Sequence, residues 1–409
     1  MLKYVLRTKK HKKEEPDMKY SASLFSQILS LLPHSAFNQI VDCANGNRYA
    51  KTFSCWDQLV AMLFCHLGQA HSLREICGGL ATCLGKLNHL GVNHVPKRST
   101  LAYANANRPW QMFQSLFFEL LNQAKAEAPS RRKFRFKNKL YSLDSSVIDL
   151  CVSVFDWAQF RKTKGAVKLH LLLDHDGYLP AYALITEGKV HDVQVARCLG
   201  FPKGTIVVFD RGYIDYEMFH QWTNKGVYFV TRLKSNAQYE ILDERTPPQR
   251  SNIQKDCIIR FTSDKTDHLY RLVVVWDQES QREFVFLTNH LSFGATTIAA
   301  IYKDRWQIEI FFKLLKQNLK IKTFVGTSAN ALKIQIWTAL ICILLLKILQ
   351  FRSKLSWSLS NLIALLRFNL FTYRDLWNWI NNPFETPLKP PENRQLEFFP
   401  IYLGQQKRG

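Results

Sequence analysis

The spacing of apolar residues separates a helical stretch of the chain from a strand-forming one. Between residue 22 and about residue 126, apolar positions recur every three or four residues, which is the period of an amphipathic helix. The predicted helices cover about 22–32, 35–43, 54–68, 71–83 and 108–126. The first part of the chain is therefore predicted to be all-helical.

After residue 140 the pattern changes to short runs rich in Val, Ile and Leu. The predicted strands cover 140–150, 166–173, 179–185, 205–209 and 227–232, and helical patterns lie at about 191–199 and 215–225. Strands that alternate with helices are typical of an α/β core. Further strands at 258–262, 270–276 and 284–287 have no helices between them, which predicts a β-rich insertion.

From residue 296 the chain is predicted to be mostly helical to about 350, with a second helical stretch over about 357–380. The most apolar run, residues 334–346, is thirteen residues long. Spanning a bilayer takes about 20 apolar residues, so we expect a buried core helix and no membrane contact.

Charge adds a class of partner. The 409 residues include 55 Lys and Arg against 33 Asp and Glu, a formal net charge of +22. The hydrophobic fraction of 47% supports a sizeable core and excludes a disordered polycation. A strongly positive surface favours a polyanion, with nucleic acid ahead of an anionic membrane.

The cysteines and the N-terminus indicate a compartment. The nine cysteines are odd in number and form no C-x-x-C pair, which argues against zinc fingers and favours reduced core thiols in a cytoplasm. Residues 1–17 are basic, but no apolar segment of a signal peptide follows them. They are predicted to be a flexible tail, and translation could also start at Met18.

A second basic stretch, residues 131–139, has six Lys or Arg and two Phe in nine positions. Such a stretch suits either a solvated linker or a segment that contacts phosphates, and both interpretations stay open.

Two aspartates stand at informative places in the strands. Asp144 lies within an apolar strand, and Asp210 directly follows the run 206–209, where Gly212 permits a sharp turn. A carboxylate in an apolar strand must be paired, bound to a metal or placed at the strand end. Ligands of open α/β sheets gather at the carboxyl ends of strands, although each aspartate alone could be a simple turn residue.

A glutamate completes the candidate set. At 100° per residue, one narrow stripe of the predicted helix holds a single acid among cations. Its members are Tyr302, Arg305, Glu309, Lys313, Lys316 and Lys320, and the opposite side holds Ile308, Ile310, Phe311, Leu314, Leu315, Leu319 and Ile321. The alternative is a solvated face with i,i+4 pairs such as Arg305–Glu309.

Two strand-end aspartates and a helical glutamate suit a site for two metal ions. Mg²⁺ takes carboxylate oxygens and leaves positions for phosphate oxygens. Two ions about 4 Å apart stabilise both the attacking and the leaving oxygen of a phosphoryl displacement. The sequence has no P-loop, H-E-x-x-H or nucleophile-elbow motif that would indicate other chemistry.

At this point the chain resembles a known family. Tyr302-x2-Arg305-x3-Glu309-x6-Lys316 matches the Y-R-E-K signature of the IS4 family of DDE transposases. Asp144 in Leu-Asp-Ser-Ser and Asp210 in Asp-Arg-Gly-Tyr match the first two catalytic acids of that family. The β-rich insertion between Asp210 and Glu309 and the helical N-terminal region are also similar, so the resemblance covers about residues 18–385.

The resemblance implies an α/β fold with an RNase H-like catalytic core. The expected parts are a basic tail (1–17), a helical DNA-binding domain (18–130), the first part of the core (135–234), the β-rich insertion (235–290), the second part of the core (291–352) and a helical C-terminal region with a tail (353–409). The core would thus be interrupted by the insertion.

The resemblance also implies roles for single residues. Asp144, Asp210 and Glu309 would be the catalytic metal ligands for two Mg²⁺ ions, for which Mn²⁺ can substitute. Tyr302, Arg305 and Lys316 would hold phosphates of the transposon end. Other candidate DNA contacts are Lys313, Arg211, Arg232, Lys234 and Trp276. Trp276 would stack on a flipped base, unless it is a core residue of its strand.

The implied activity is cut-and-paste transposition of a bacterial insertion sequence. The enzyme would bind terminal inverted repeats as a homodimer, nick the DNA, form and open a hairpin, and join the 3′-OH to target DNA in the nucleoid. The alternatives are a catalytically inactive DNA-binding remnant and a stand-alone nuclease of the same fold.

Overall fold

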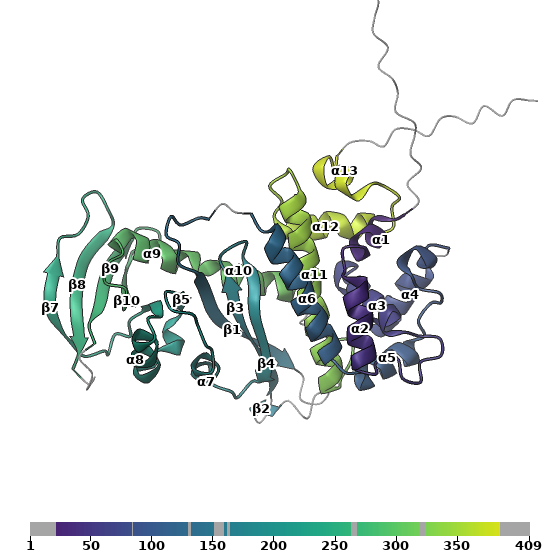
Figure 1. Cartoon of the computed structure of the whole chain (residues 1–409), viewed down its shortest axis with the longest axis horizontal. Helices are drawn as coiled ribbons and strands as arrows, with labels where there is room; N and C mark the ends of the chain where they lie inside the picture. Colours follow the sequence, from purple (N-terminus) through teal and green to yellow (C-terminus); the bar gives the residue numbers. More distant parts are fainter. Residues whose placement is uncertain are drawn as a thin grey trace, which may run out of the picture.

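A computed structural model describes residues 22–83, 85–129, 132–150, 159–161, 164–262, 268–319 and 324–384. The predicted basic tail, the alternative start at Met18 and Lys320 lie outside these residues. The molecule is elongated, with helices gathered in one half and a large sheet in the other (Figure 1).

The N-terminal region of the chain is helical, as predicted. Its elements are α1 (Leu24–Leu29), α2 (His34–Cys43), α3 (Cys55–Leu67), α4 (Leu73–Ala81), the 3-10 turn η1 (Leu87–Leu90), α5 (Arg98–Asn107) and α6 (Gln111–Glu127). Ser54 and Asp57 form a reciprocal capping box at the start of α3. The sequence pattern missed α5, because only Leu101, Ala104 and Asn105 of this helix are buried.

The sheet has the strand order of an RNase H-like core, so this prediction is confirmed. The strands are β1 (Leu140–Leu150), β2 (Gln159–Arg161), β3 (Lys164–Asp174), β4 (Leu179–Glu187), β5 (Ile206–Phe209) and β6 (Tyr228–Arg232). β1, β3 and β4 are antiparallel, whereas β1, β5 and β6 are parallel, in the order β4-β3-β1-β5-β6. The helices α7 (Asp192–Arg197) and α8 (Tyr216–Asn224) cover one face.

The β-rich segment extends the same sheet. Its strands are β7 (Tyr239–Arg245), β8 (Ile253–Phe261), β9 (Tyr270–Asp277) and β10 (Arg282–Thr288). β10 pairs with β6, so the sheet continues through β10, β9, β8 and β7. The sequence pattern did not predict β7. Six of its seven residues are exposed, so apolar and polar residues do not alternate along it as they do in a half-buried strand.

The helices after the sheet are interrupted twice. α9 (Ala295–Asp304) and α10 (Trp306–Lys313) meet at Arg305, and a π-helical turn, η4 (Leu314–Asn318), follows. The interruptions change which side chains are covered. Ile310, predicted to be in the core, is 47% exposed, because α10 packs on the sheet side through Ile308, Phe311 and Phe312.

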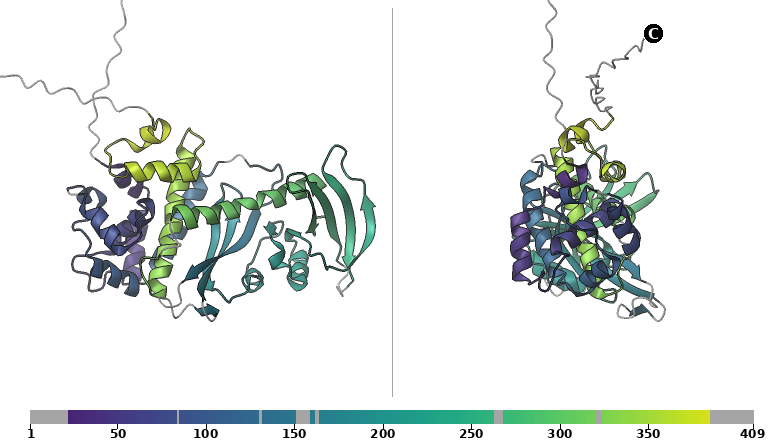
Figure 2. Two further views of the ribbon diagram at one scale, coloured as in Figure 1. Left: turned by 180° about the vertical axis from the view of Figure 1, so that it is seen from behind. Right: turned by 90° about the vertical axis from the view of Figure 1, so that its right-hand side faces the viewer.

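The C-terminal helices are α11 (Ala329–Arg352), α12 (Leu359–Asn369) and α13 (Leu376–Asn381). α11 is long and apolar enough to cross a membrane, but 94% of its most apolar window is buried inside the protein. It packs against α3, α5, α6 and α12. Figure 2 shows this long helix between the N-terminal helices and the sheet. Main-chain hydrogen bonds from Leu24 and Phe25 to residues 372 and 370 join α1 to the last helices. The N-terminal and C-terminal regions thus share one core around α11.

Candidate active site

Strand register places Asp144 and Asp210 side by side. β1 and β5 run parallel with Leu143 opposite Phe209, so the next residue on each strand is an aspartate. Leu143 and Phe209 pack in the cluster under α7 and α8. Because side chains alternate between faces, both carboxylates point to the other face, which α9 and α10 cover.

Arg305 lies between two of the three candidate acids. Its Nη2 is 2.6 Å from Oε1 of Glu309, and its Nη1 is 3.7 Å from Oδ2 of Asp144. The i,i+4 pair that the sequence offered as an alternative therefore exists, but it is not a solvated one. The Arg305 side chain is only 12% exposed and reaches across to β1.

The pKa of Asp144 reflects the neighbouring acids. Burial is the main cause that raises the pKa of this carboxyl to about 7. The amide of Ser145, which donates to Oδ1 at 2.8 Å, and the charge of Arg305 oppose the shift, whereas the charges of Asp210 and Glu309 add to it. The charges of Asp210 and Glu309 therefore both act on the carboxyl of Asp144.

Asp210 is held by the turn that follows it. Its Oδ1 accepts a 2.8 Å hydrogen bond from the amide of Gly212. A Cβ atom at residue 212 would stand 2.9 Å from that same oxygen. Gly212 therefore serves close approach to the carboxylate, since it has no positive φ that would demand glycine.

The oxygen atoms of the three candidate carboxylates suit a hard divalent cation, although the side chains do not surround a common metal position in this structure. Within the described residues, no three His, Cys, Asp or Glu side chains are arranged to hold a metal ion. The converging groups are oxygen donors with no thiol or imidazole among them, which is the preference of Mg²⁺. The guanidinium of Arg305 now supplies the positive charge between Asp144 and Glu309.

Asp144 leads to a prediction on pH and stability. The folded chain keeps the proton up to about pH 7, whereas the unfolded chain loses it near pH 4. The folded state therefore binds more protons in this window, and the free energy of unfolding should fall as the pH rises from 4 to 7. The difference in unfolding free energy between wild type and Asp144→Asn should therefore change by ~2–4 kcal/mol between pH 4 and pH 7.

Urea unfolding at several pH values, with EDTA present, measures this difference. Asp149→Asn is the matched control, because Asp149 lies on the same strand with an exposed side chain. Equal pH slopes for wild type and Asp144→Asn would contradict the raised pKa.

Other predicted DNA contacts line the same sheet edge. Parallel register places Arg232 of β6 level with Asp210. The Arg232 guanidinium lies 4.5 Å from the centre of the Phe284 ring. Tyr302 packs its ring 4.7 Å from that of Phe286, and Arg305 lies over the Tyr302 ring at 5.4 Å. Aromatic faces thus fix two of the cations beside the acids.

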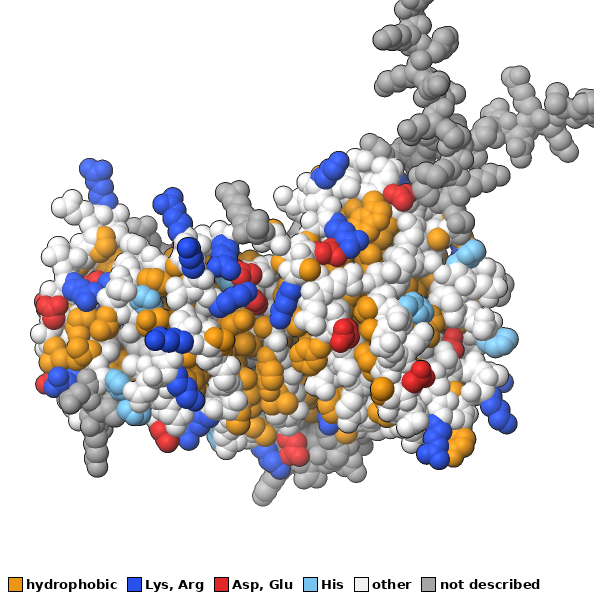
Figure 3. Space-filling model, viewed as in Figure 1, with side chains coloured by type: hydrophobic (Ala, Val, Ile, Leu, Met, Phe, Trp, Pro, Cys, Tyr) orange, Lys and Arg blue, Asp and Glu red, His pale blue; other side chains and the backbone are white. Residues whose placement is uncertain are grey.

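The remaining candidates are more scattered. Lys316 donates from Nζ to the carbonyl of Val147 on β1 at 2.8 Å. Lys313, Arg211 and Lys234 are exposed. Trp276 is half-buried near the end of β9, at the sheet edge where β5 and β6 also end. Figure 3 shows basic side chains spread over the sheet half of one face.

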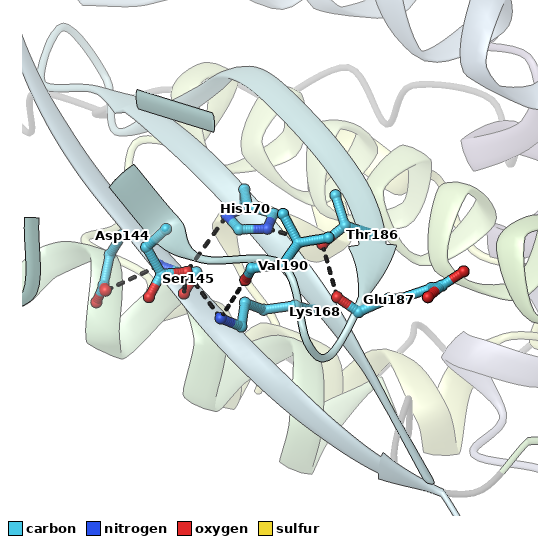
Figure 4. Close-up of polar contacts among 8 residues, drawn as sticks. Asp144, Ser145, Lys168, His170, Thr186, Glu187 and Val190 are labelled. Carbon is cyan, nitrogen blue, oxygen red and sulfur yellow. Dashed lines mark hydrogen bonds and ion pairs between the residues drawn. The ribbon is translucent and has the colours of Figure 1, made fainter. Parts of the chain in front are cut away.

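A polar cluster supports β1 next to Asp144 (Figure 4). The hydroxyl of Ser145 donates to Asp192 at 2.7 Å, and Lys168 donates to Asp192 at 3.1 Å and to the carbonyl of Val190 at 2.8 Å. His170, fully buried, joins Thr186 at 2.9 Å. The Lys168 charge is thus used inside the protein, where it ties the start of α7 to β3, while Ser145 ties it to β1.

The sequence missed a buried carboxylate at the end of α9. Asp304, 2% exposed, accepts from Lys133 at 2.5 Å, from Nδ1 of His175 at 2.7 Å and from the Tyr178 hydroxyl at 3.0 Å. A 2.7 Å hydrogen bond joins Nε2 of His175 to Ser142, two residues before Asp144. Asp304 therefore links the residue before Arg305 to β1. The neighbouring Arg305 belongs to the predicted charged stripe, but no sequence pattern indicated that Asp304 is buried.

The basic stretch at 131–139 is a linker for its described part, residues 132–139. Several of its cations are used in ion pairs, since Arg132 and Lys139 contact Asp176, and Lys133 contacts Asp304. Phe134 and Phe136 stack on each other, and Phe136 stacks on Phe293. The stretch thus also fixes the start of β1.

The strand order is that of an RNase H-like core, the fold of DDE-type enzymes of DNA phosphoryl transfer. A family profile described as a transposase DDE domain matches residues 136–345. The chain belongs to this family of DDE transposases, consistent with the IS4 type that its motifs resemble. A second profile, a domain of unknown function (DUF4372), matches residues 21–93 of the helical region.

Curated relatives have the same character. A putative transposase of Sinorhizobium fredii is 30% identical over 74% of this chain and 85% of its own length. The probable transposase for insertion sequence element IS5377 of Geobacillus stearothermophilus is 28% identical over 63% of this chain and 68% of its own. The putative transposase for insertion sequence element IS4SA of Synechocystis is 28% identical over 61% of this chain and 71% of its own.

Among solved structures, a piggyBac transposase synaptic complex with hairpin DNA matches at a TM-score of 0.41 and 10% identity, over 89% of this chain and 81% of that one. The protein is a DNA transposase and binds DNA, and the chemistry of its family depends on divalent metal.

Proposed function

We propose that the chain catalyses cut-and-paste transposition of a bacterial insertion sequence, with Asp144, Asp210 and Glu309 as ligands of two Mg²⁺ ions that Mn²⁺ can replace. The observation that carries this proposal is geometric: strand register places Asp144 beside Asp210, and Arg305 bridges Asp144 and Glu309. When bound, the ions would supply Lewis-acid activation of the attacking water and of the leaving oxygen.

The surrounding side chains would grip the phosphates that flank the scissile bond. Arg305, Tyr302 and Lys316 would hold the transposon end. Arg232, on the neighbouring strand β6, would contact the next phosphate along the DNA. Cations held by ring faces, as Arg305 and Arg232 are, lose less freedom when they bind a phosphate. Arg211, Lys234 and Lys313 would add exposed charge, and Trp276 would stack on an extruded base.

The finer partners are also proposals. We infer terminal inverted repeats and a target duplex as substrates, a homodimer in the DNA complex, and a DNA-binding role for the helical region of residues 18–130. The cytoplasmic, nucleoid-associated location expected from the cysteines and the basic charge stays a prediction.

A strand-transfer assay tests the proposal against its two alternatives. Purified protein is incubated with duplexes that carry the cognate terminal repeats, with a target plasmid and Mg²⁺. We expect both cleavage at the ends and covalent joining to the plasmid. Cleavage without joining would favour a stand-alone nuclease, and end binding without cleavage would favour an inactive remnant.

A further inference from the structure

A hollow of about 800 Å³ lies behind α10, on the side away from the catalytic acids. We name it the α12 hollow. Its walls are the β3–β4 turn, Pro129, Arg132 and Lys133, the end of α11 and the start of α12. The residues that matter below are Lys347, Lys354, Arg132, Lys133, Ser358 and Tyr178.

Lys347 is the unusual residue of the α12 hollow. It lies within the apolar helix α11 and is only 7% exposed. Its Nζ donates to the carbonyl of Gly177 at 3.0 Å and lies 5.9 and 5.7 Å from the rings of Tyr178 and Phe351. No carboxylate of the described residues pairs with it, and burial lowers its pKa to about 8. A buried ammonium without a counter-ion is costly.

Other groups at the wall attract an anion as well. Lys354 is exposed, and its ammonium makes no ion pair within the described residues. α12 begins here, capped by Ser358, and directs the positive end of its dipole toward the hollow. Arg132 and Lys133 add little free charge, since Asp176 and Asp304 already balance them.

The hollow and the proposed catalytic acids lie on opposite sides of α10 and of the turn that follows it. Gln307, Ile310 and Leu314 face the hollow, whereas Arg305 and Glu309 face Asp144. An anion in the hollow is therefore separate from the phosphates at the scissile bond.

We propose that the α12 hollow binds a backbone phosphate of duplex DNA that flanks the cleaved end, through Lys347, Lys354 and the start of α12. The inference rests on the DNA transposase function. A DNA backbone is the anion that suits an open hollow on a chain with a net charge of +22, because it offers phosphates along its whole length.

The first test is the salt dependence of DNA affinity, measured by fluorescence anisotropy with a long end duplex. Lys354→Gln should lower affinity by roughly tenfold and reduce the slope of log K against log salt by about 0.9, the value for one phosphate contact. Lys225→Gln is the matched control, because Lys225 is an exposed lysine at the end of α8, on the other face of the sheet. An unchanged slope in Lys354→Gln would overturn the proposal.

The second test separates a binding role of Lys347 from a structural one. Lys347→Met removes the buried charge at similar length, so we expect the melting temperature without DNA to rise by about 2 °C while DNA affinity falls. A lower melting temperature would show that the lysine is a structural partner and would overturn the proposal. A second result would also overturn the proposal: inorganic phosphate raises the melting temperature of the wild type, while both variants keep normal DNA affinity. The hollow would then bind a small anion and not DNA.

These outcomes are distinct from failure of the proposed reaction. The anisotropy measurement reports DNA binding alone and requires neither cleavage nor joining. If the wild type itself does not cleave, the salt slope still decides whether the hollow contacts DNA.

Discussion

Replacing Asp210 with asparagine should reduce strand cleavage by at least ~10³-fold while end binding is retained, because the change removes a proposed metal ligand and leaves the fold in place. Asparagine can accept the hydrogen bond from the amide of Gly212 as aspartate does, so the turn after β5 should persist. Cleavage of a labelled end duplex in Mg²⁺ measures the first quantity, and a mobility shift measures the second.

Asp149→Asn is the control for this experiment, because it removes one carboxylate charge from β1 at an exposed position. It should cleave like the wild type. Normal cleavage by Asp210→Asn would refute the metal assignment, and loss of binding together with loss of cleavage would point to misfolding instead.

Truncation of Asp304 should be the most destabilising single change around the site. Although burial opposes its charge, hydrogen bonds from His175 and Lys133 lower the pKa of Asp304. Asp304→Ala leaves the half-buried His175 and Tyr178 without this acceptor, which should cost about 3 kcal/mol of unfolding free energy. Cleavage should also fall at least roughly tenfold, because the next residue is Arg305. Urea unfolding and the cleavage assay measure the two effects.

Tyr178→Phe is the graded control, since it removes one of the three donors and should cost about 1 kcal/mol. An Asp304→Ala protein as stable as Tyr178→Phe would mean that the carboxylate does not organise the α9–α10 junction.

The three candidate acids stood out in the sequence because each follows a local rule. Asp144 lies in an apolar strand run, Asp210 directly follows one, and Glu309 shares a helical stripe with Tyr302 and Arg305. Their proposed roles came from the family resemblance. The apolar run of α11 was equally clear, because a helix buried on all sides needs no pattern of faces. Elements with few buried residues, such as α5 and β7, left no comparable signal.

Tertiary structure decided the contacts between segments distant in the chain. The alignment of Asp144 beside Asp210 and the position of Arg305 between Asp144 and Glu309 could not be derived from the sequence, because strand register and helix breaks depend on packing. The burial of Asp304 and of Lys347 likewise follows from neighbours more than a hundred residues away. The sequence by itself determined which residues can do the chemistry, and only the fold decided which of them meet.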